Sequence, residues 1–560
     1  MGIAELKEAA AKVNRERAEV NAKLKTQLEG LKLSEGEKWE RIWASDFNEL
    51  RDSLQRGVFS AVETLHAFQY RALLVHERCN NVTQFLTDSE KWARQLDENY
   101  PNAGERPPLF GLPFSLKEQF LLKGEYTISG LAYNLGRDCM LGREDAVAVT
   151  VLREAGAVPF ARTNTPQTAL WYSSGNPVFG LTTNSHDKTR GAGGSSSGEG
   201  PSTACWAAPF GIGTDGGGSI RIPAGFCGSA GIKFTMARVS QKGWVNPMPG
   251  GSHLAMSWGP LSRHVDALVA VAKAAFVPAN NRLDPYTASL PFNEQLYASD
   301  KKLRIGYYDD DGFFPSVPVM RRAVRETKDR LEAEGHTLGT FVLPFAPPDA
   351  WHAFALFSTV FNPEAGARTL KEVRRDLPDE LARPMYFLIG LPLWLKSFVC
   401  WFLGFFWPRF GFIGTLMTTR SARLVEVFEQ VNLYRDRFTR LWREQRLDAL
   451  IAPAFAHPAP PHSLPNMCPA GASYTGLYNL LDYTCGVVPV TRVTVEDERD
   501  TQLHYPTGDP YEKMTKAAFV KETVGLPVAV QVVALPHHEE VALRLMKEVE
   551  TAANFDFCQL

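Results

Sequence analysis

Apolar positions near the start of this chain follow the spacing of helices. The pattern is clearest at Val62, Leu65, Phe68, Ala72 and Leu73. This spacing places their side chains on one face of a helix. Residues 4–30 are rich in Ala, Glu, Lys and Arg, which predicts an exposed helix. We therefore expect an N-terminal helical region over residues 1–105, closed by a loop of Pro, Gly and Asn around 101–108.

After residue 105 the pattern changes to short apolar runs separated by helical segments. Runs of buried-strand length lie at 112–118, 157–160, 303–307, 448–452 and 528–533. Two other segments, 144–155 and 319–334, have helical spacing, and Gly156 and Gly335 can end these helices. Alternation of strands and helices favours an α/β fold in which helices cover a sheet.

The composition is that of a folded protein without a strong charge bias. The 560 residues carry a formal net charge of −2, and 44% of them are hydrophobic. This balance argues against a disordered chain and gives no argument for nucleic-acid binding. The eight cysteines are scattered without a C-x-x-C pair, which favours reduced thiols over a disulfide framework or a zinc site. The first 30 residues contain no apolar run, so we expect neither a signal peptide nor a membrane span there.

A second apolar region, residues 385–417, is rich in aromatic side chains. It contains Trp394, Phe398, Trp401, Phe402, Phe405, Phe406, Trp407, Phe410 and Phe412. Spanning a bilayer takes about 20 apolar residues, whereas the uncharged stretch 397–408 would reach only about 18 Å as a helix. Two interpretations remain. The region is either a helical hairpin buried in the core, or a segment in the membrane interface with Lys396 and Arg409 reaching lipid phosphates.

Glycine-rich strings around two serines carry the strongest chemical signal. Ser195 lies within Gly-Gly-Ser-Ser-Ser-Gly-Glu at 193–199, and Ser219 lies within Gly-Thr-Asp-Gly-Gly-Gly-Ser-Ile-Arg-Ile-Pro-Ala at 213–224. Glycines let backbone N–H groups converge on one point, and acyl transfer requires a nucleophilic hydroxyl beside such donors. Taken alone, however, both serines fit ordinary loop residues, and Lys117 in the run 112–118 fits a solvated strand lysine.

Together with Lys117 at the end of its apolar run, these two strings closely resemble the amidase signature enzymes. The likeness covers residues 108–550 and includes Ser-Gly-Asn-Pro at 174–177, Leu-Asp-Tyr at 481–483 and Gly-Leu-Pro-Val-Ala-Val-Gln at 525–531. The resemblance implies a large twisted mixed β-sheet covered by helices, with 106–560 as the catalytic domain. It also implies that Ser219 is the nucleophile, that Lys117 is base and acid, and that Ser195 passes the proton between them.

The same resemblance assigns roles to neighbouring residues. The backbone amides that would form the oxyanion hole are those of Gly216, Gly217, Gly218 and Ser219. Lys117 must be neutral at working pH, which burial favours by lowering the pKa of its amine. Ala169 is expected to contact the substrate through its backbone. Ser196 is expected to support the serines by hydrogen bonding, and Asp215 and Arg221 are expected to brace the loop as an ion pair.

Within the family, the chain is most similar to members that act on fatty acid amides, mainly through the aromatic segment. That similarity implies a membrane-associated serine hydrolase of fatty acid ethanolamides and primary fatty acid amides, with esters as further substrates. It favours a membrane-binding helical cap at 385–417 over the buried hairpin. It further implies a homodimer on the cytoplasmic face of endomembranes, with no cofactor, metal or nucleic-acid partner.

Two other functions stay open at this point. A soluble amidase of small polar amides, such as a glutaminase-type amidotransferase subunit, would share the lysine and the two serines but has no need for an aromatic cap. A non-catalytic membrane-binding scaffold would need none of the three, so their presence argues against it. The glycines at 211, 213 and 216 also match a dinucleotide-binding fingerprint, but no acidic residue lies at 236–240, about 20 positions later.

Overall fold

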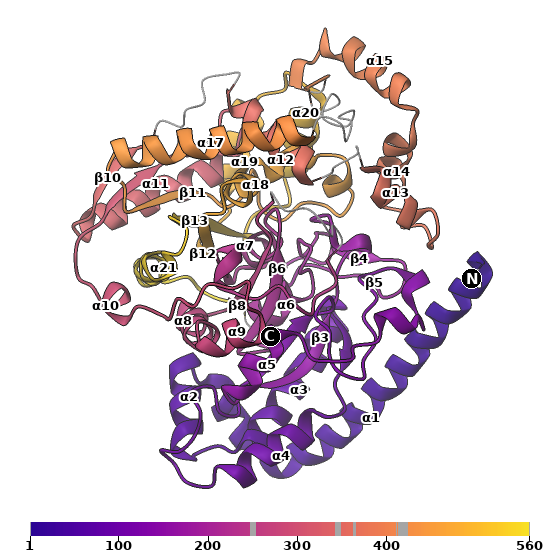
Figure 1. The fold of residues 1–560 in the computed structure, drawn as a ribbon, viewed down its shortest axis with the longest axis vertical. Coiled ribbons are helices and arrows are strands. Elements are labelled where there is room, and N and C mark those ends of the chain that lie inside the picture. The colour runs from indigo at the N-terminus through magenta and orange to yellow at the C-terminus, as the bar shows by residue number, and fades with distance from the viewer. Residues whose placement is uncertain are drawn as a thin grey trace.

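A mixed β-sheet forms the centre of the protein (Figure 1). The computed structural model describes residues 2–246, 254–341, 349–361, 366–409, 411–412 and 424–558. Within these ranges the sheet has 11 strands, and their order across it is β1 (Val82–Phe85), β3 (Val158–Thr163), β2 (Pro113–Lys117), β6 (Phe210–Asp215), β8 (Ser257–Ser262), β7 (Ala230–Lys233), β12 (Thr484–Arg492), β13 (Pro527–Ala534), β11 (Ala449–Pro453), β9 (Arg304–Tyr307) and β10 (Thr337–Thr340). The predicted large mixed sheet is confirmed.

Parallel strands towards both ends of this sheet flank an antiparallel centre. β3, β2 and β6 run parallel, as do β11, β9 and β10, while the strands between these groups pair antiparallel. Parallel neighbours end at the same edge of a sheet, so the carboxyl ends of β2 and β6 lie side by side. Both strands are buried along their whole length. This edge therefore brings Lys117, at the end of β2, next to Thr214 and Asp215, at the end of β6.

Most of the elements expected from the apolar pattern are present. The runs at 112–118, 157–160, 303–307, 448–452 and 528–533 form β2, β3, β9, β11 and β13. The helical patterns at 144–155 and 319–334 form α5 (Val147–Glu154) and α11 (Pro318–Ala333). The boundaries differ from the expected ones by a few residues, as is usual where a helix end depends on its cap.

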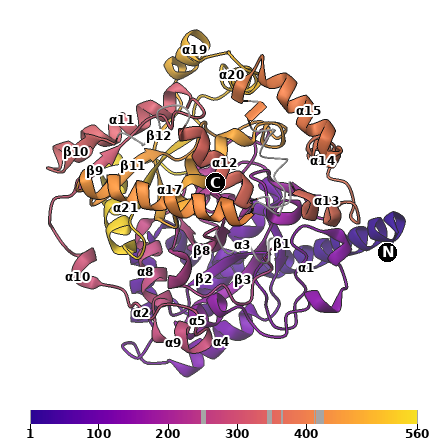
Figure 2. The ribbon, with the colours of Figure 1, turned by 45° about the horizontal axis from the view of Figure 1, so that its top comes forward.

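The N-terminal region is mainly helical, but it shares the core of the sheet. α1 (Ile3–Ala44) is a single long helix along the outside of the molecule, followed by α2 (Phe47–Arg56), α3 (Ala61–Cys79) and α4 (Ser89–Asn99) (Figures 1 and 2). Between α3 and α4 the chain forms β1, which pairs antiparallel with β3. Leu65 and Phe68 of α3 are buried in the same apolar cluster as the strands. Residues 1–105 and the rest of the chain are thus joined by one hydrophobic core.

The aromatic segment forms short helices at the outer edge of the molecule. α14 (Arg383–Gly390) is followed by α15 (Leu393–Gly404), and Figure 1 shows α15 beyond α13 (Ala367–Val373) and α14. Six side chains of α15 and the turn after it are 49–71% exposed: Trp394, Phe398, Trp401, Phe402, Phe405 and Phe406. A buried hairpin is therefore wrong for these residues, while Phe410 and 413–417 lie outside the described residues. No helix in the described part of the chain combines the length and apolarity needed to cross a membrane.

The two cations that flank the aromatic segment have partners inside the protein. Lys396 is only 8% exposed and donates to the Ile389 carbonyl oxygen at 3.0 Å, in the last turn of α14, where carbonyls have no partner within the helix. Arg409 forms ion pairs with Asp509 and Glu512. The expectation that Lys396 and Arg409 reach lipid phosphates is therefore wrong: Lys396 bonds within the segment, and Arg409 ties the segment to the body of the protein.

Candidate active site

Lys117 is the last residue of β2, and its side chain is completely enclosed. Phe114 and Leu116 alternate with Ser115 and Lys117 along the strand, so the two polar side chains share a face. That face packs against the loop that carries Ser195 and against α6 (Glu199–Ala204). Lys117 is therefore 0% exposed. The local pattern allowed Lys117 to face solvent, but in the structure it does not.

The Lys117 amine contacts two hydroxyl groups. Its Nζ lies 2.7 Å from Ser195 Oγ and 2.8 Å from Thr214 Oγ1. Burial lowers the pKa of Lys117 to about 7, although nearby carboxylates, Asp215 and Glu199 among them, act in the opposite direction. A large fraction of the amine is therefore neutral near pH 7, as a lysine base requires.

Thr214 and Gln119, whose roles the sequence motifs did not indicate, set the direction of hydrogen bonding around Lys117. Thr214 Oγ1 donates to Gln119 Oε1 at 2.9 Å, and Gln119 Nε2 donates to the Val245 carbonyl at 2.9 Å. Because the Val245 carbonyl orients the Gln119 amide, the amide oxygen accepts the Thr214 proton. Thr214 must then accept an N–H from Lys117, which leaves the lone pair of the neutral amine for Ser195.

The two serine-containing loops are bonded to each other. Ser196 N–H donates to the Ser219 carbonyl at 3.1 Å, and Ser196 Oγ donates to the Thr214 carbonyl at 3.4 Å. Ser196 therefore has the supporting hydrogen bonds expected of it. Because the loop of Ser195 and the loop of Ser219 are connected in this way, their positions relative to the end of β6 are fixed together.

Ser219 lies in the turn between β6 and α7 (Arg221–Cys227), which is anchored by the expected ion pair. Arg221 donates to the two oxygens of Asp215 at 3.0 and 2.9 Å. The same carboxylate accepts the backbone N–H of Gly218 at 2.8 Å and that of Ile220 at 3.1 Å. Although burial opposes ionisation, the Arg221 charge and the hydrogen bonds hold the pKa of Asp215 well below its usual range. One buried carboxylate thus fixes the chain on both sides of Ser219.

Three residues from the C-terminal third of the chain complete the surroundings of Arg221. Its N–H groups donate to Gln531 Oε1 at 2.7 Å, Asn479 Oδ1 at 2.6 Å and the Thr475 carbonyl at 3.0 Å. Asn479 is on α18 (Ser473–Leu481), just before the Leu-Asp-Tyr string, and Gln531 ends the string at 525–531. These two regions of family resemblance therefore position Arg221. Their spacing along the sequence did not indicate this role.

Gly218 has a backbone conformation that other residues resist. Its φ is +119°, and a Cβ at this position would lie 2.5 Å from Thr475 Oγ1. Thr475 Oγ1 itself donates to the Gly217 carbonyl at 2.6 Å. Since the Gly218 N–H is bonded to Asp215, this amide holds the loop in shape, which differs from the expected role as one of four oxyanion donors.

A second buried carboxylate, that of Glu199, lies close to Lys117 and was not assigned from the sequence. It accepts hydrogen bonds from Ser115 Oγ at 2.6 Å and from Thr163 Oγ1 at 2.7 Å. Burial raises the pKa of Glu199 to about 7, against the effect of these bonds and of the Lys117 charge. A Cβ at Gly211 would lie 1.7 Å from Glu199 Oε2. Gly211 is therefore needed for this carboxylate to reach its place beside β2.

Ala169 ends a tight turn, η3 (Gln167–Ala169), at the edge of the site. Thr168 and Ala169 have φ of +68° and +56°, a left-handed conformation that is uncommon for residues with a side chain and is concentrated at functional turns. Ala169 N–H donates to the Pro166 carbonyl at 2.9 Å, and Gln167 Nε2 donates to Asp376 Oδ2 at 2.7 Å. The turn is thus held from both sides at the edge of the site.

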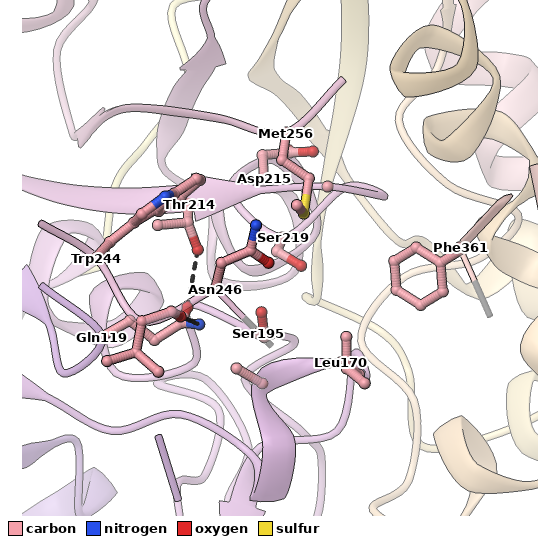
Figure 3. Close-up of a pocket in the computed structure, with 13 residues that line it drawn as sticks. Gln119, Leu170, Ser195, Thr214, Asp215, Ser219, Trp244, Asn246, Met256 and Phe361 are labelled. Carbon is pink, nitrogen blue, oxygen red and sulfur yellow. Dashed lines mark hydrogen bonds between the residues drawn. The ribbon is translucent and has the colours of Figure 1, made fainter. Parts of the chain in front are cut away.

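Ser195, Ser219 and Ala169 line the same pocket, which contains about 370 Å³ of empty space including its opening. In Figure 3 the two serines lie between a polar side and an apolar side. The polar side has Gln119 and Thr214, with Trp244 and Asn246 beside them, and the apolar side has Leu170 and Phe361. A pocket of this kind can hold a polar group and an apolar chain on opposite sides of a reacting carbon.

Comparison with known proteins identifies relatives over almost the whole chain. The family model described as Amidase matches residues 63–543. Fatty acid amide hydrolase 1 of Caenorhabditis elegans is 38% identical over 514 residues, which cover 91% of this chain and 88% of the relative. Fatty-acid amide hydrolase 1 of Sus scrofa is 40% identical over 516 residues, which cover 91% of this chain and 86% of the relative.

A solved structure of a fatty acid amide hydrolase has the same fold. Its TM-score is 0.80 at 23% identity, and the match covers 99% of this chain and 97% of that chain. At this identity the structural likeness supports the fold, while the family assignment rests on the sequence matches. The family model covers most of the chain, and both relatives are well above 30% identical across nine-tenths of it. This chain therefore belongs to the amidase family.

Proposed function

We propose that this chain is a membrane-associated serine hydrolase that cleaves fatty acid amides, such as fatty acid ethanolamides and primary fatty acid amides, to a fatty acid and an amine. The observation that carries the proposal is the buried Lys117 amine 2.7 Å from Ser195, in the site that also holds Ser219. The substrate class is supported by the two fatty acid amide hydrolases that match most of this chain.

In the first half of the reaction, Ser219 attacks the acyl carbon of the amide. The Ser219 proton passes to Ser195, while the Ser195 proton passes to the lone pair of Lys117, so that the amine becomes an ammonium. The bonds of Thr214 and Gln119 support this direction of transfer, because Thr214 donates to Gln119 and the lone pair of the neutral amine is left available to accept the Ser195 proton. The tetrahedral intermediate then carries a negative charge on the former carbonyl oxygen.

Backbone amides in the glycine-rich loop stabilise that charge. We assign the oxyanion hole to the N–H groups of Gly216, Gly217 and Ser219, because Gly218 N–H donates to Asp215. Removing one donor of an oxyanion hole typically lowers the rate by about 10²- to 10³-fold. The carbonyl of Ala169, which also lines the pocket, is proposed to contact the amide N–H of the substrate.

The second half of the reaction reverses the proton path. The Lys117 ammonium returns its proton through Ser195 to the leaving nitrogen, so the C–N bond breaks and a neutral amine departs. A water molecule then loses a proton along the same path and attacks the acyl–Ser219 ester. The ester bond breaks, the fatty acid leaves, and Ser219 recovers its proton.

A row of aromatic rings supports an acyl-chain path between the pocket and the aromatic segment. It starts at Phe361, which lines the pocket at the end of α12 (Asp349–Phe361), and the centroid of its ring is 5.3 Å from that of Phe357. Phe357, Phe354, Phe313 and Phe412 follow at 6.2, 4.5 and 6.5 Å between successive centroids. Phe412 belongs to the segment 385–417. Apolar packing of this kind beside the pocket suits a fatty acyl chain better than a small polar amide.

The exposed face of α15 is the proposed membrane contact. A soluble monomer seldom exposes so many adjacent aromatic side chains, and burying each in a lipid interface contributes about 1.5–3 kcal/mol. Because Lys396 and Arg409 are paired internally, we propose that apolar insertion, rather than attraction to lipid phosphates by these two cations, holds the protein on the bilayer.

The proposed chemistry is tested by labelling and by substrate comparison. Reaction with a fluorophosphonate, followed by peptide mapping, should give an adduct on Ser219 in the folded protein, and no adduct would contradict a serine hydrolase. A long-chain acyl ethanolamide should be hydrolysed faster than glutamine or acetamide at equal concentration. If glutamine is the better substrate, the fatty acid amide proposal is wrong while the hydrolase proposal stands.

We extend the proposal to a homodimer on the cytoplasmic face of endomembranes, which rests on the family resemblance. Light scattering of the detergent-solubilised protein should give twice the mass of the chain. In intact microsomes the whole chain should be cleaved by added protease without permeabilisation. A mass equal to that of one chain would contradict the homodimer. Protection of the chain from the protease would contradict its place on the cytoplasmic face.

A further inference from the structure

Two cysteines that are far apart in the sequence meet on the far side of α6 from the active site. Cys205 caps the C-terminal end of α6, the helix that begins with Glu199, and Cys558 is in the C-terminal tail. Their Sγ atoms are 3.7 Å apart, although 353 positions separate the two residues, and the Cys205 thiol donates to Cys558. Among the described residues no cysteine forms a disulfide. The two thiols are thus in contact without a bond between their sulfur atoms.

The tail that carries Cys558 is held in place by hydrogen bonds to arginines. One guanidinium nitrogen of Arg263 donates both to the Cys558 carbonyl at 2.7 Å and to the Ala204 carbonyl at 2.9 Å. Arg492 donates to the Asp556 carbonyl at 2.6 Å. Because Arg263 bridges the tail and the end of α6, the closeness of the two sulfur atoms does not depend on the thiol contact alone.

The surroundings of the two thiols differ in a way that suits sequential oxidation. The hydrogen bond from Cys205 lowers the pKa of Cys558, and the guanidinium groups of Arg78, Arg263 and Arg492 lower it further. The same hydrogen bond and burial raise the pKa of Cys205. Cys558 is 9% exposed, whereas Cys205 is 0% exposed. A solute that reaches the pair therefore meets the more reactive sulfur first.

We propose that Cys205 and Cys558 are a redox site that forms a reversible disulfide on reaction with a hydroperoxide. The Cys558 thiolate attacks the O–O bond and becomes a sulfenic acid, while the hydroperoxide takes up a proton and leaves as an alcohol, or as water when it is hydrogen peroxide. The Cys205 sulfur then attacks the sulfenic sulfur, the S–S bond forms, and the hydroxyl leaves as water with the Cys205 proton. The two thiols lose two electrons, which reduce the peroxide, and a dithiol restores both by exchange.

The disulfide would tie the C-terminal tail to the helix that follows the Ser195 loop. A cross-link between positions so far apart restricts the unfolded chain, so the oxidised protein should melt at a higher temperature than the reduced one. This effect is independent of the proposed hydrolase activity, because neither cysteine lines the pocket.

Peptide mapping of the oxidised full-length protein tests the proposal. The reduced protein is freed of reductant, treated with hydrogen peroxide, alkylated without reduction and digested. We expect one cross-linked pair of peptides containing Cys205 and Cys558, which dithiothreitol separates again, together with a raised melting temperature before reduction. Recovery of both residues as alkylated thiols, or of Cys558 as a sulfinic acid without a cross-link, would overturn the proposal.

Two variants show whether the thermal effect belongs to this pair. Cys558→Ser should abolish both the cross-link and the rise in melting temperature on oxidation. Cys139→Ser removes an exposed cysteine elsewhere and should retain both. If oxidation raises the melting temperature of Cys558→Ser by the same amount, the rise comes from oxidation at another site. The mapping itself is done on the unaltered chain, so it decides the proposal even if a variant fails to fold.

Discussion

The site around Lys117 and the surface of α15 depart in opposite ways from the usual distribution of residues. In the site, an amine, two carboxylates and several hydroxyls are buried, and hydrogen bonds pair them with one another. On α15, aromatic side chains face outward with little protein around them. Polar groups are normally outside and large aromatic groups inside, so both arrangements cost free energy in a soluble protein.

The comparison teaches that each cost is offset by a different partner. A buried amine is tolerated when it is neutral and hydrogen-bonded, which is the state that a base needs. An exposed aromatic row is tolerated when another apolar phase covers it. The first region is therefore complete within the chain, whereas the second is covered only by the membrane contact that we propose. Substitutions should separate the two regions cleanly: changes near Lys117 should alter turnover, and changes on α15 should alter membrane binding.

The largest effect is expected for Ser219→Ala, which should lower turnover by about 10⁶-fold, as the loss of a serine nucleophile does elsewhere. Hydrolysis of a long-chain and a short-chain amide should fall alike, with an unchanged melting temperature and vesicle binding. Ser197→Ala, which removes a buried serine bonded to the Asn164 carbonyl, is the control and should stay active. Substantial turnover by Ser219→Ala would show that another residue is the nucleophile.

Lys117→Ala should lower amide hydrolysis by about 10²- to 10⁴-fold, the usual range for loss of an acid–base group. Hydrolysis of an ester with the same acyl chain should fall less, because an alkoxide leaves more readily than an amine without a proton from Lys117. Rates for the matched amide and ester measure the difference. Equal losses for both would argue against protonation of the leaving group by this residue.

The double replacement of Trp401 and Phe405 with Ser should lower the affinity for vesicles, measured by sedimentation. Each lost aromatic side chain should account for about tenfold or more, because its apolar burial is lost. Hydrolysis of a soluble short-chain amide should change less than twofold. Leu33→Ser is a matched control, because Leu33 is also exposed but lies on α1. Unchanged sedimentation of the double variant would mean that α15 is not the membrane contact.

Thr214→Val should lower turnover by about 10- to 100-fold, since it leaves a buried N–H of Lys117 without an acceptor at a cost of about 1–3 kcal/mol. Thr214→Ser keeps the hydroxyl and is expected to remain close to the unaltered protein. Measuring kcat and KM separately locates the effect, which should appear in kcat. If the Val variant is as active as the Ser variant, the Thr214–Gln119 pair does not orient the base.

The smallest effect is a shift in pH dependence on Glu199→Gln. In the unaltered protein kcat/KM should rise with pH through about 7, the pKa of Lys117, because the neutral amine is the base. The Glu199 charge raises that pKa, so its removal should move the rising limb to lower pH by less than about one unit. The control Glu144→Gln, at an exposed position, should leave the rising limb of kcat/KM in place. A shift of this limb to higher pH in Glu199→Gln would contradict the assigned effect of the Glu199 charge on the pKa of Lys117.

Local patterns predicted five of the eleven strands that the described residues form in the sheet, and they marked the glycine-rich loops at its edge. The alternation in β2, the apolar runs of β11 and β13, and the glycine-rich strings around Ser195 and Ser219 are features of neighbouring residues. Neighbouring residues are sufficient to favour a strand or a tight loop, because backbone preference and side-chain periodicity act over a few positions. The family resemblance added which of these residues belong to one site.

Partners that come from distant parts of the chain could not be predicted in this way. Arg221 is positioned by Asn479 and Gln531, more than 250 positions away, and Thr214 bonds Lys117 from another strand. The flanking cations of the aromatic segment show the same limit. On either side of the aromatic stretch 397–408 they fit a membrane interface, yet Arg409 has its partners at Asp509 and Glu512, about a hundred positions away.

The sequence by itself, through its family resemblance, indicated Lys117, Ser195 and Ser219 as candidates for the chemistry, and it showed which stretch is too aromatic for an ordinary surface. The tertiary structure decided their physical state. Lys117 is enclosed, so a large fraction of its amine is neutral near pH 7, and the Gly218 N–H is bonded to Asp215. The aromatic rings of α15 are exposed, whereas Lys396 is buried. The reason is that a pKa, a free hydrogen-bond donor and an exposed face are properties of surroundings, and those surroundings are assembled from residues that only the fold brings together.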